Sequence, residues 1–168
     1  MTLLEWGALG ELIGGIAIIG SLLYVGVQVK NSARATRSAT ANDASVHMQS
    51  WYLEIGSDVE KSAAFLNGMA NPDSLSREEF FQFTMMTHAA FLAFQNAYYL
   101  SQEGTLDPGI QRSITNIILG VKDQPGLHVY WNERKQLLYP GFVEFVDDLL
   151  ASDEHMPLTS YRSPEKSE

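Results

Sequence analysis

Residues 12–29 read LIGGIAIIGSLLYVGVQV, eighteen consecutive residues without a charge. A helix rises about 1.5 Å per residue, so roughly 20 apolar residues cross the hydrocarbon core of a bilayer, which is about 30 Å thick. Trp6 and Tyr24 suit the aromatic belts that mark the two membrane interfaces. The stretch therefore predicts a membrane anchor over residues 1–30, rather than a fully buried helix of a soluble domain.

The charges that flank this stretch predict its orientation. Lys30, Arg34 and Arg37 follow it closely, whereas no Lys or Arg precedes it. A cleavable signal peptide carries positive charge before its apolar region, so we expect an uncleaved anchor. Because Lys and Arg favour the cytoplasmic side, the N-terminus is predicted outside and the C-terminal domain in the cytoplasm.

Small residues recur along one side of the predicted anchor. At about 100° per residue they fall within about 80° of one another, and Gly10 and Gly14 form a small-xxx-small pair. Small side chains let two helices approach closely, so this side predicts a homo-oligomer or docking on a larger membrane-protein complex. The predicted interface consists of Gly7, Gly10, Gly14, Ala17, Ser21 and Gln28.

The chain after Arg37 is acidic, with 8 Lys or Arg against 18 Asp or Glu, and it contains no cysteine. Nucleic-acid surfaces need clustered positive charge, so no nucleic-acid partner is expected. Without cysteine there is no disulfide, thiolate nucleophile or Cys-based metal site. No histidine has a Glu three residues before it, and phosphate-binding glycine loops and a Gly-x-Ser-x-Gly elbow are missing. We therefore expect no cofactor or metal, and no enzyme.

Helix start and stop signals divide the chain after residue 30. Residues 31–56 contain no Gly or Pro before Gly56, which predicts a helical stalk that stops at Gly56 in the left-handed conformation. Ser57 and Glu60 have the spacing of a capping box, and Ser76 and Glu79 repeat it.

Later signals complete the predicted domain. Further helices are expected to begin at Asp107-Pro108, near Leu127 and at Tyr139-Pro140. Residues 57–152 are thus predicted to hold about five helices, and residues 153–168 to form a flexible tail. No useful strand-like alternation occurs, so the predicted fold is all-α: one N-terminal transmembrane helix that continues into a stalk, then a small cytoplasmic helical bundle.

Residues 80–102 form the longest uncharged stretch of the predicted domain. A second membrane span would fit the lack of charge, but the eight polar residues within the stretch favour a buried central helix. His88, Gln95 and Gln102 lie seven residues apart and so form a polar row, with Thr84 beside it. The row predicts either a pocket lined by Thr84, His88 and Gln95, or an internally hydrogen-bonded part of the core.

Two further clusters carry predictions. Tyr130 and Trp131 are expected to pack into the bundle while Glu133, Arg134 and Lys135 face water. The acidic pair at 147 and 148 is predicted to lie on a solvated helix face.

Four segments carry a resemblance to a known family. They are LGELIGGIAIIGSLLYVGVQVKNSARATR (9–37), PDSLSREE (72–79), FQNAYYLSQEGTLD (94–107) and PGLHVYWNERKQLLYPGFVEFVDDLL (125–150). In these the chain resembles a widespread, uncharacterised family of small bacterial proteins with one N-terminal transmembrane helix and a helical cytoplasmic domain. The resemblance implies a single-pass protein of the bacterial inner membrane, and it implies no activity and no site residue.

Taken together, these features predict a membrane-anchored accessory or scaffolding protein without enzymatic activity, with the bilayer and a membrane complex as partners. The alternative is a membrane-tethered sensor of a small ligand, with the polar row at His88 and Gln95 lining its pocket.

Overall fold

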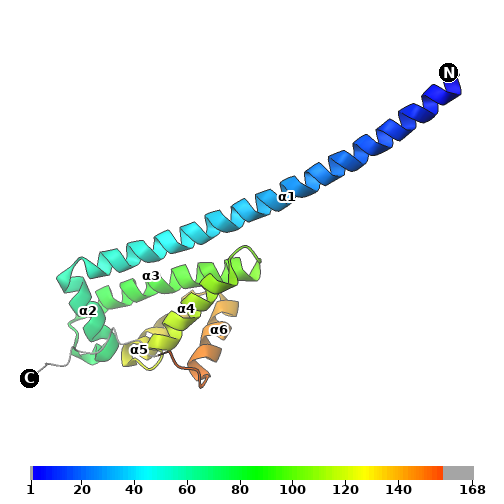
Figure 1. Cartoon of the computed structure of the whole chain (residues 1–168). Coiled ribbons are helices and arrows are strands. Elements are labelled where there is room, and N and C mark those ends of the chain that lie inside the picture. The colour runs from blue at the N-terminus through cyan, green and yellow to red at the C-terminus, as the bar shows by residue number, and fades with distance from the viewer. Residues whose placement is uncertain (1, 157–168) are drawn as a thin grey trace, which may run out of the picture. The chain divides into compact units, whose positions relative to one another are not determined.

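The computed structural model describes residues 2–156, apart from the side chains of residues 5 and 9, and all regular elements in this part of the chain are helical. The all-α prediction is confirmed. Six α-helices and two short 3₁₀ turns follow one another (Figure 1): α1 (Leu3–Gly56), α2 (Val59–Ala70), η1 (Pro72–Ser74), α3 (Arg77–Gln102), α4 (Pro108–Val121), α5 (Pro125–Arg134), η2 (Lys135–Leu137) and α6 (Pro140–Ala151). Most of the predicted tail, residues 157–168, lies outside the described residues.

The chain divides into two units, residues 1–39 and residues 40–168, and we call the second the compact unit. α1 belongs to both, because it continues through the boundary. The part predicted as a stalk, residues 31–56, is therefore divided, and its last turns pack in the compact unit. The side chains that make this packing are Ala44, Met48, Trp51 and Ile55.

The corner between α1 and α2 differs in detail from its prediction. α1 ends at Gly56 as expected, but among the described residues only Gly104 has a positive φ, so the left-handed stop at Gly56 is wrong. The predicted capping box at Ser57 is also wrong. Asp58 caps α2 instead, since its Oδ1 accepts hydrogen bonds from the backbone N–H groups of Glu60 (2.9 Å) and Lys61 (3.0 Å).

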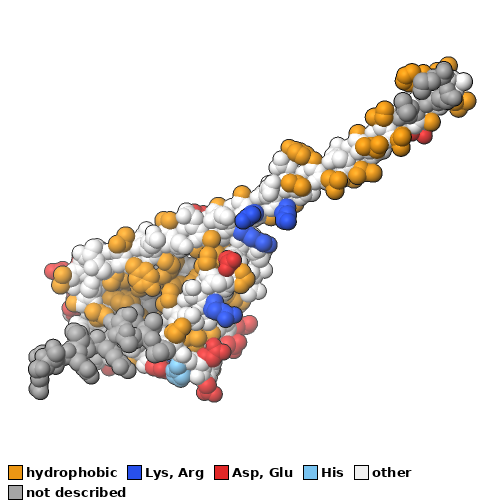
Figure 2. Space-filling view, in the orientation of Figure 1, with side chains coloured by type: hydrophobic (Ala, Val, Ile, Leu, Met, Phe, Trp, Pro, Cys, Tyr) orange, Lys and Arg blue, Asp and Glu red, His pale blue; other side chains and the backbone are white. Residues whose placement is uncertain are grey.

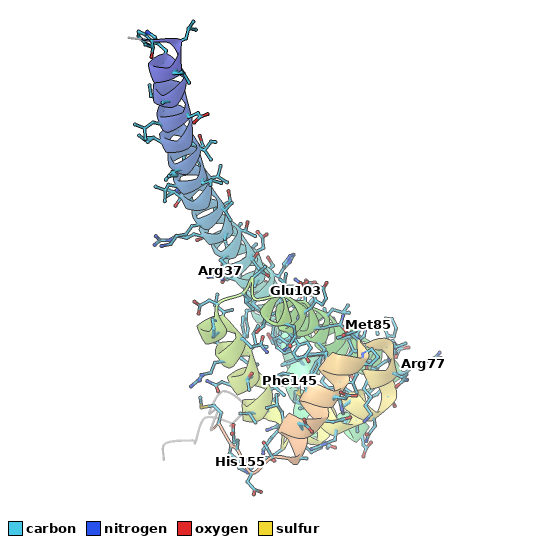
Figure 3. All side chains as sticks on the ribbon, turned by 90° about the vertical axis from the view of Figure 1, so that its right-hand side faces the viewer. Arg37, Arg77, Met85, Glu103, Phe145 and His155 are labelled. Atoms are coloured by element: carbon cyan, nitrogen blue, oxygen red, sulfur yellow. The ribbon has the colours of Figure 1, made fainter. Side chains whose placement is uncertain are left out.

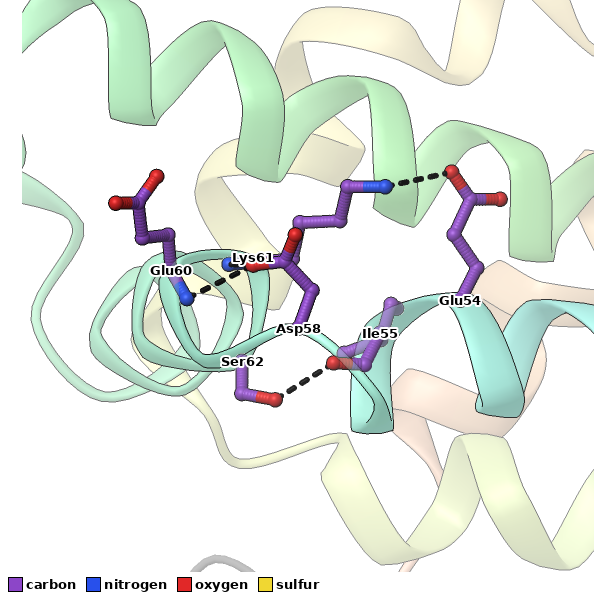
Figure 4. Close-up of polar contacts among 6 residues, drawn as sticks. All are labelled: Glu54, Ile55, Asp58, Glu60, Lys61 and Ser62. Atoms are coloured by element: carbon purple, nitrogen blue, oxygen red, sulfur yellow. Dashed lines mark hydrogen bonds and ion pairs between the residues drawn. The ribbon is translucent and has the colours of Figure 1, made fainter.

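Side chains also close this corner from both helices (Figure 4). The Ser62 hydroxyl donates to the carbonyl oxygen of Ile55 at 2.6 Å, and the Lys61 ammonium pairs with the Glu54 carboxylate at 3.0 Å. The end of α1 is thereby tied to the first turn of α2.

α3 begins where its start signal predicts. Ser76 and Glu79 form the expected capping box, and the carboxylate of Glu79 accepts from the backbone N–H of Ser76 at 2.8 Å. These bonds from Ser76 lower the pKa of Glu79. At the other end, Gly104 has φ +67°, a conformation that favours glycine.

α3 supplies much of the core of the compact unit. Figure 1 shows it alongside the last turns of α1, with shorter helices on its other side. The ring of Phe91 lies 5.0 Å from that of Tyr130 and 5.3 Å from that of Trp131, which confirms that both α5 residues pack inward. Seven side chains of α3 are buried, so residues 80–102 form a core helix: Phe83, Thr84, Thr87, Ala90, Phe91, Phe94 and Ala97.

Three helices begin with the same dipeptide, Pro-Gly, at Gly109 of α4, Gly126 of α5 and Gly141 of α6. Proline suits the first helical position because its missing N–H would have no partner there. Gly126 has a further role, since a Cβ atom on it would lie 1.9 Å from the carbonyl oxygen of Gly68. The backbones of α2 and α5 therefore touch at this pair of glycines.

Candidate functional site

The first half of α1 is apolar and uncovered. Within residues 2–156, α1 is the one helix that is long and apolar enough to cross a membrane. Every side chain from Leu12 to Val29 is exposed, and even the least exposed large one, Val25, keeps 54 % of its surface. Figure 2 shows hydrophobic side chains distributed along this part of the helix.

The few polar groups inside this stretch are bonded within the helix itself. The Ser21 hydroxyl donates to the carbonyl oxygen of Ala17 at 2.8 Å, and the Gln28 amide donates to the Tyr24 hydroxyl at 2.9 Å. In hydrocarbon a polar group without a partner costs several kcal/mol. These bonds reduce the cost of placing residues 12–29 in lipid.

The predicted interface of small residues lies wholly on this part of α1. A Cβ atom added to Gly7, Gly10 or Gly14 would meet open space within 4 Å. Nothing in the described chain covers this side, and its use as an interface stays a prediction.

The predicted topology residues follow on the same helix. Lys30, Arg34 and Arg37 are exposed, and no ion pair within the described residues includes them. No acidic residue occurs between Glu11 and Asp43. This short segment is therefore positive in a chain whose formal net charge is −9.

The structure separates the members of the predicted polar row by giving them different partners. His88 Nδ1 lies 2.9 Å from the Tyr130 hydroxyl, and Gln95 Oε1 accepts a hydrogen bond from the backbone N–H of Tyr139 at 2.6 Å. Burial, with a smaller contribution from the positive charge of Arg134, lowers the pKa of His88, and burial raises the pKa of Tyr130. These bonds link α3 to α5 and to the start of α6.

Thr84 completes that row from inside the core. Its side chain is 1 % exposed, and its hydroxyl oxygen has no hydrogen-bond partner among the described residues. Gln102, at the far end, is exposed. In this structure the row thus contributes a core side chain and hydrogen bonds between helices, and its use as a pocket stays a prediction.

Two grooves flank the last turns of α1 in the compact unit. A groove of about 410 Å³ lies against α3, with Trp51 in its wall, and one of about 310 Å³ lies against α4. Neither is lined by Thr84, His88 or Gln95. The polar wall of the first groove comes from His47, Ser50 and Glu54, whose spacing on one continuous helix would have pointed to it.

The Trp51 indole fixes the position of α1 between these grooves, because its N–H donates to the carbonyl oxygen of Met86 at 2.8 Å.

The acidic pair of α6 has two roles. Asp148 is exposed as predicted, and the Asp147 side chain is partly exposed but has partners that the prediction did not include. Asp147 Oδ1 accepts from the Trp131 indole at 2.6 Å, and its Oδ2 lies 3.0 Å from the Lys135 ammonium. The bond from Trp131, with the bond and charge of Lys135, lowers the pKa of Asp147. Lys135 is accordingly paired and half-buried, whereas it was expected to face water freely.

No protein family, curated protein or solved structure matches this chain. The resemblance to small bacterial proteins with one membrane helix therefore stays a prediction. Within residues 2–156 there is also no group of three or more His, Asp or Glu side chains placed to hold a metal ion.

Proposed function

We propose that this protein is a single-pass protein of the bacterial inner membrane, whose compact unit acts as an accessory or scaffolding module at the cytoplasmic face. The proposal depends on one observation above all, the uncharged stretch of α1 from Leu12 to Val29, in which every side chain is exposed. Soluble monomers rarely expose contiguous apolar patches of this length.

The hydrophobic free energy favours a bilayer around this stretch. Its exposed large apolar side chains number eleven, and each contributes about 1.5–3 kcal/mol on leaving water, so the total exceeds about 15 kcal/mol. The polar groups that oppose insertion are bonded within the helix at Ser21 and Gln28. The balance therefore supports insertion.

The orientation with the N-terminus outside is supported by Lys30, Arg34 and Arg37 alone, since they carry the positive charge next to the span. A binding role for the compact unit is supported by the two surface grooves beside α1. The polar row gives less support to a ligand sensor, because His88 and Gln95 are bonded to the unit's own helices.

Extraction tests the anchor. Washed membranes that contain the full-length chain are treated with alkaline carbonate, and we expect the protein to stay in the pellet until detergent is added. Lysine at both Ile16 and Ile19 should raise the fraction that carbonate releases, since each lysine near the centre of a span costs about 3 kcal/mol and the pair therefore removes a large part of the free energy that favours insertion. The matched control places lysine at Val46 and Leu53, which are exposed on the same helix outside the stretch. Release of the wild-type chain by carbonate refutes the anchor.

Two further measurements test the orientation and the role. Because the chain has no cysteine, Thr2→Cys and Glu144→Cys can be labelled singly with an impermeant maleimide in spheroplasts. We expect label at residue 2 and none at residue 144, and the reverse pattern contradicts the orientation. A chain that purifies gently from its own cells as a lone monomer contradicts the scaffolding role.

A further inference from the structure

Three positive side chains follow the apolar stretch of α1 on one side of the helix. Lys30, Arg34 and Arg37 are spaced four and three residues apart, so at about 100° per residue they fall within about 60° of one another. We call these three residues the basic stripe. Figure 2 shows the Lys and Arg side chains of α1 close to one another, beyond its hydrophobic half. The positive charge of this segment is therefore concentrated on one side of one helix.

The basic stripe has no acidic neighbour close to it on its own helix. All three side chains are exposed, and no ion pair within residues 2–156 includes them. The nearest carboxylate along α1 is that of Asp43, six residues beyond Arg37 and so about 9 Å farther along the helix axis. The stripe can therefore bind an anion that the described chain does not supply.

We propose that the basic stripe binds the phosphate groups of anionic phospholipids in the cytoplasmic leaflet. This inference rests on the membrane anchor and the orientation proposed above. Lys30 directly follows the uncharged stretch, and Arg34 and Arg37 lie about 7.5 Å and about 12 Å beyond Val29 along the helix axis. The headgroup layer on each side of a bilayer is about 5–7 Å thick. The stripe thus begins within this layer and ends just outside it.

The direction of side chains on a helix brings the outer members of the stripe back toward the headgroups. Every Cα–Cβ bond of an α-helix is tilted toward the helix N-terminus, and long side chains follow the same direction. In α1 this direction is that of the proposed bilayer. Figure 3 labels Arg37, the member of the stripe farthest from the apolar stretch. Long arginine side chains can extend along the helix from there and place their charged ends at the depth of the lipid phosphates.

The residue types of the stripe suit a phosphate ligand. The guanidinium group is planar and presents paired N–H donors that fit two oxygen atoms of one phosphate, whereas an ammonium group binds phosphate as a point charge. The stripe combines two guanidinium groups with one ammonium group. Each Lys or Arg near an anionic leaflet strengthens binding about fivefold. The stripe should therefore favour anionic over zwitterionic headgroups.

The number of charges is sufficient because the anchor supplies the attachment. A soluble polybasic segment needs about four to eight positive charges to recognise an anionic membrane. Here the apolar half of α1 holds the chain in the bilayer, so the stripe only selects among headgroups. α1 also continues without a break from Leu3 to Gly56, so the three side chains are arranged along one helix before any lipid binds. Such preorganisation reduces the entropy that is lost on binding.

Lipid retention tests the stripe. The full-length chain is reconstituted into vesicles that contain phosphatidylglycerol and phosphatidylcholine in equal amounts and with the same acyl chains. It is then extracted with a mild non-ionic detergent and purified, and the lipids that remain bound are measured by mass spectrometry. We expect retained phosphatidylglycerol to exceed phosphatidylcholine about tenfold or more, since each positive charge contributes about fivefold.

Two arginine substitutions locate the preference. Arg34→Gln combined with Arg37→Gln should lower the retained lipid ratio about tenfold or more, and Lys30 is kept so that a positive charge still follows the span. The matched control combines Arg77→Gln with Arg112→Gln, which removes the same charge from two exposed arginines of the compact unit. The control should leave the ratio unchanged. Maleimide labelling at residue 2 reports whether each variant keeps its orientation.

Three results overturn the proposal. The first is equal retention of the two lipids by the wild type, and the second is an undiminished ratio in a correctly oriented Arg34→Gln, Arg37→Gln variant. The third is displacement of the lipid by millimolar inorganic phosphate at constant ionic strength, because the stripe would then be a site for soluble phosphate.

Carbonate extraction of the same vesicles reports separately on the anchor. A chain that carbonate retains but that shows no lipid preference refutes the lipid site and keeps the anchor. A chain that carbonate releases, but whose preference for phosphatidylglycerol still depends on Arg34 and Arg37, refutes the anchor and retains the stripe as a site at the membrane surface.

Discussion

Replacing Gly126 with alanine should destabilise the compact unit strongly. The new methyl carbon would lie 1.9 Å from the carbonyl oxygen of Gly68 and 2.8 Å from the Cα of Met69. A carbon atom needs about 3.3 Å from such an oxygen, so α5 would have to move about 1.4 Å from α2. Both partners are backbone atoms, which no rotamer change can displace. We expect the overpacking to lower the free energy of unfolding by about 3 kcal/mol, the upper end of the range for overpacked sites. The higher helix propensity of alanine offsets at most about 1 kcal/mol of this loss.

The Pro-Gly repeat supplies matched controls for this substitution. Gly109→Ala and Gly141→Ala occupy the equivalent position of α4 and α6, but their methyl groups would meet only the side chains of Asp107 and Tyr139, at 2.9 Å each. The Tyr139 ring can rotate, so we expect a change within about 1 kcal/mol for Gly141→Ala. Asp107 caps α4 by accepting from the backbone N–H of Gly109 at 2.7 Å, so Gly109→Ala can also lose this cap, at a cost of about 1 kcal/mol. Thermal unfolding of the full chain in detergent, followed by near-ultraviolet circular dichroism, should show a midpoint lowered by about 10 °C for Gly126→Ala alone. An equal midpoint for all three variants refutes the close contact of α2 and α5.

Three other perturbations have expected outcomes. Asp147→Ala should lower the free energy of unfolding by about 1 kcal/mol at pH 7, a modest figure because the carboxylate is 43 % exposed. The pKa of Asp147 is lowered in the folded state, so in urea titrations the stability difference from wild type should shrink as the pH falls below the ordinary range of Asp and through the folded pKa. Lys122 is 4 % exposed, and its ammonium donates to the carbonyl oxygen of Ser152 at 2.5 Å. Lys122→Met should therefore lower the free energy of unfolding by about 1–2 kcal/mol and speed amide hydrogen exchange in the last turn of α6. An unchanged exchange rate argues against this bond. His88 has a lowered pKa, so the unfolded chain binds its proton first and the wild type should lose stability as the pH falls through the ordinary range of histidine; a His88→Gln variant with the same pH slope shows that the histidine is not the cause.

Local signals were sufficient where a structure depends on neighbouring residues. The Ser76 capping box, the left-handed Gly104 and the proline at the start of α4 and α6 were predictable because each needs only the residues within one turn. The error in the capping residue of α2, Ser57 instead of Asp58, also concerns residues within one turn. Ser57 and Asp58 are both good caps, and the choice depends on where the preceding helix ends.

Contacts between distant residues escaped the sequence for a physical reason. The partners of Asp147 were missed because Trp131 lies on α5 and Lys135 on η2, outside the helix of Asp147. The polar row was visible in the heptad spacing, yet its partners Tyr130 and Tyr139 depend on how α3 packs against α5 and α6. The spacing of His47, Ser50 and Glu54 could have shown one polar wall of the first groove, but the opposite wall comes from α3 and depends on the same packing.

The indole of Trp51 has a consequence for the order of events during synthesis. Its acceptor, the carbonyl of Met86, is made 35 residues later, and the core against which α1 packs extends to Val146 on the last helix. The apolar half of α1 therefore leaves the ribosome long before its other half has anything to dock on. If residues 12–29 enter the bilayer as proposed, the compact unit completes its folding while already tethered, with the nascent chain confined to the membrane surface rather than free in the cytosol.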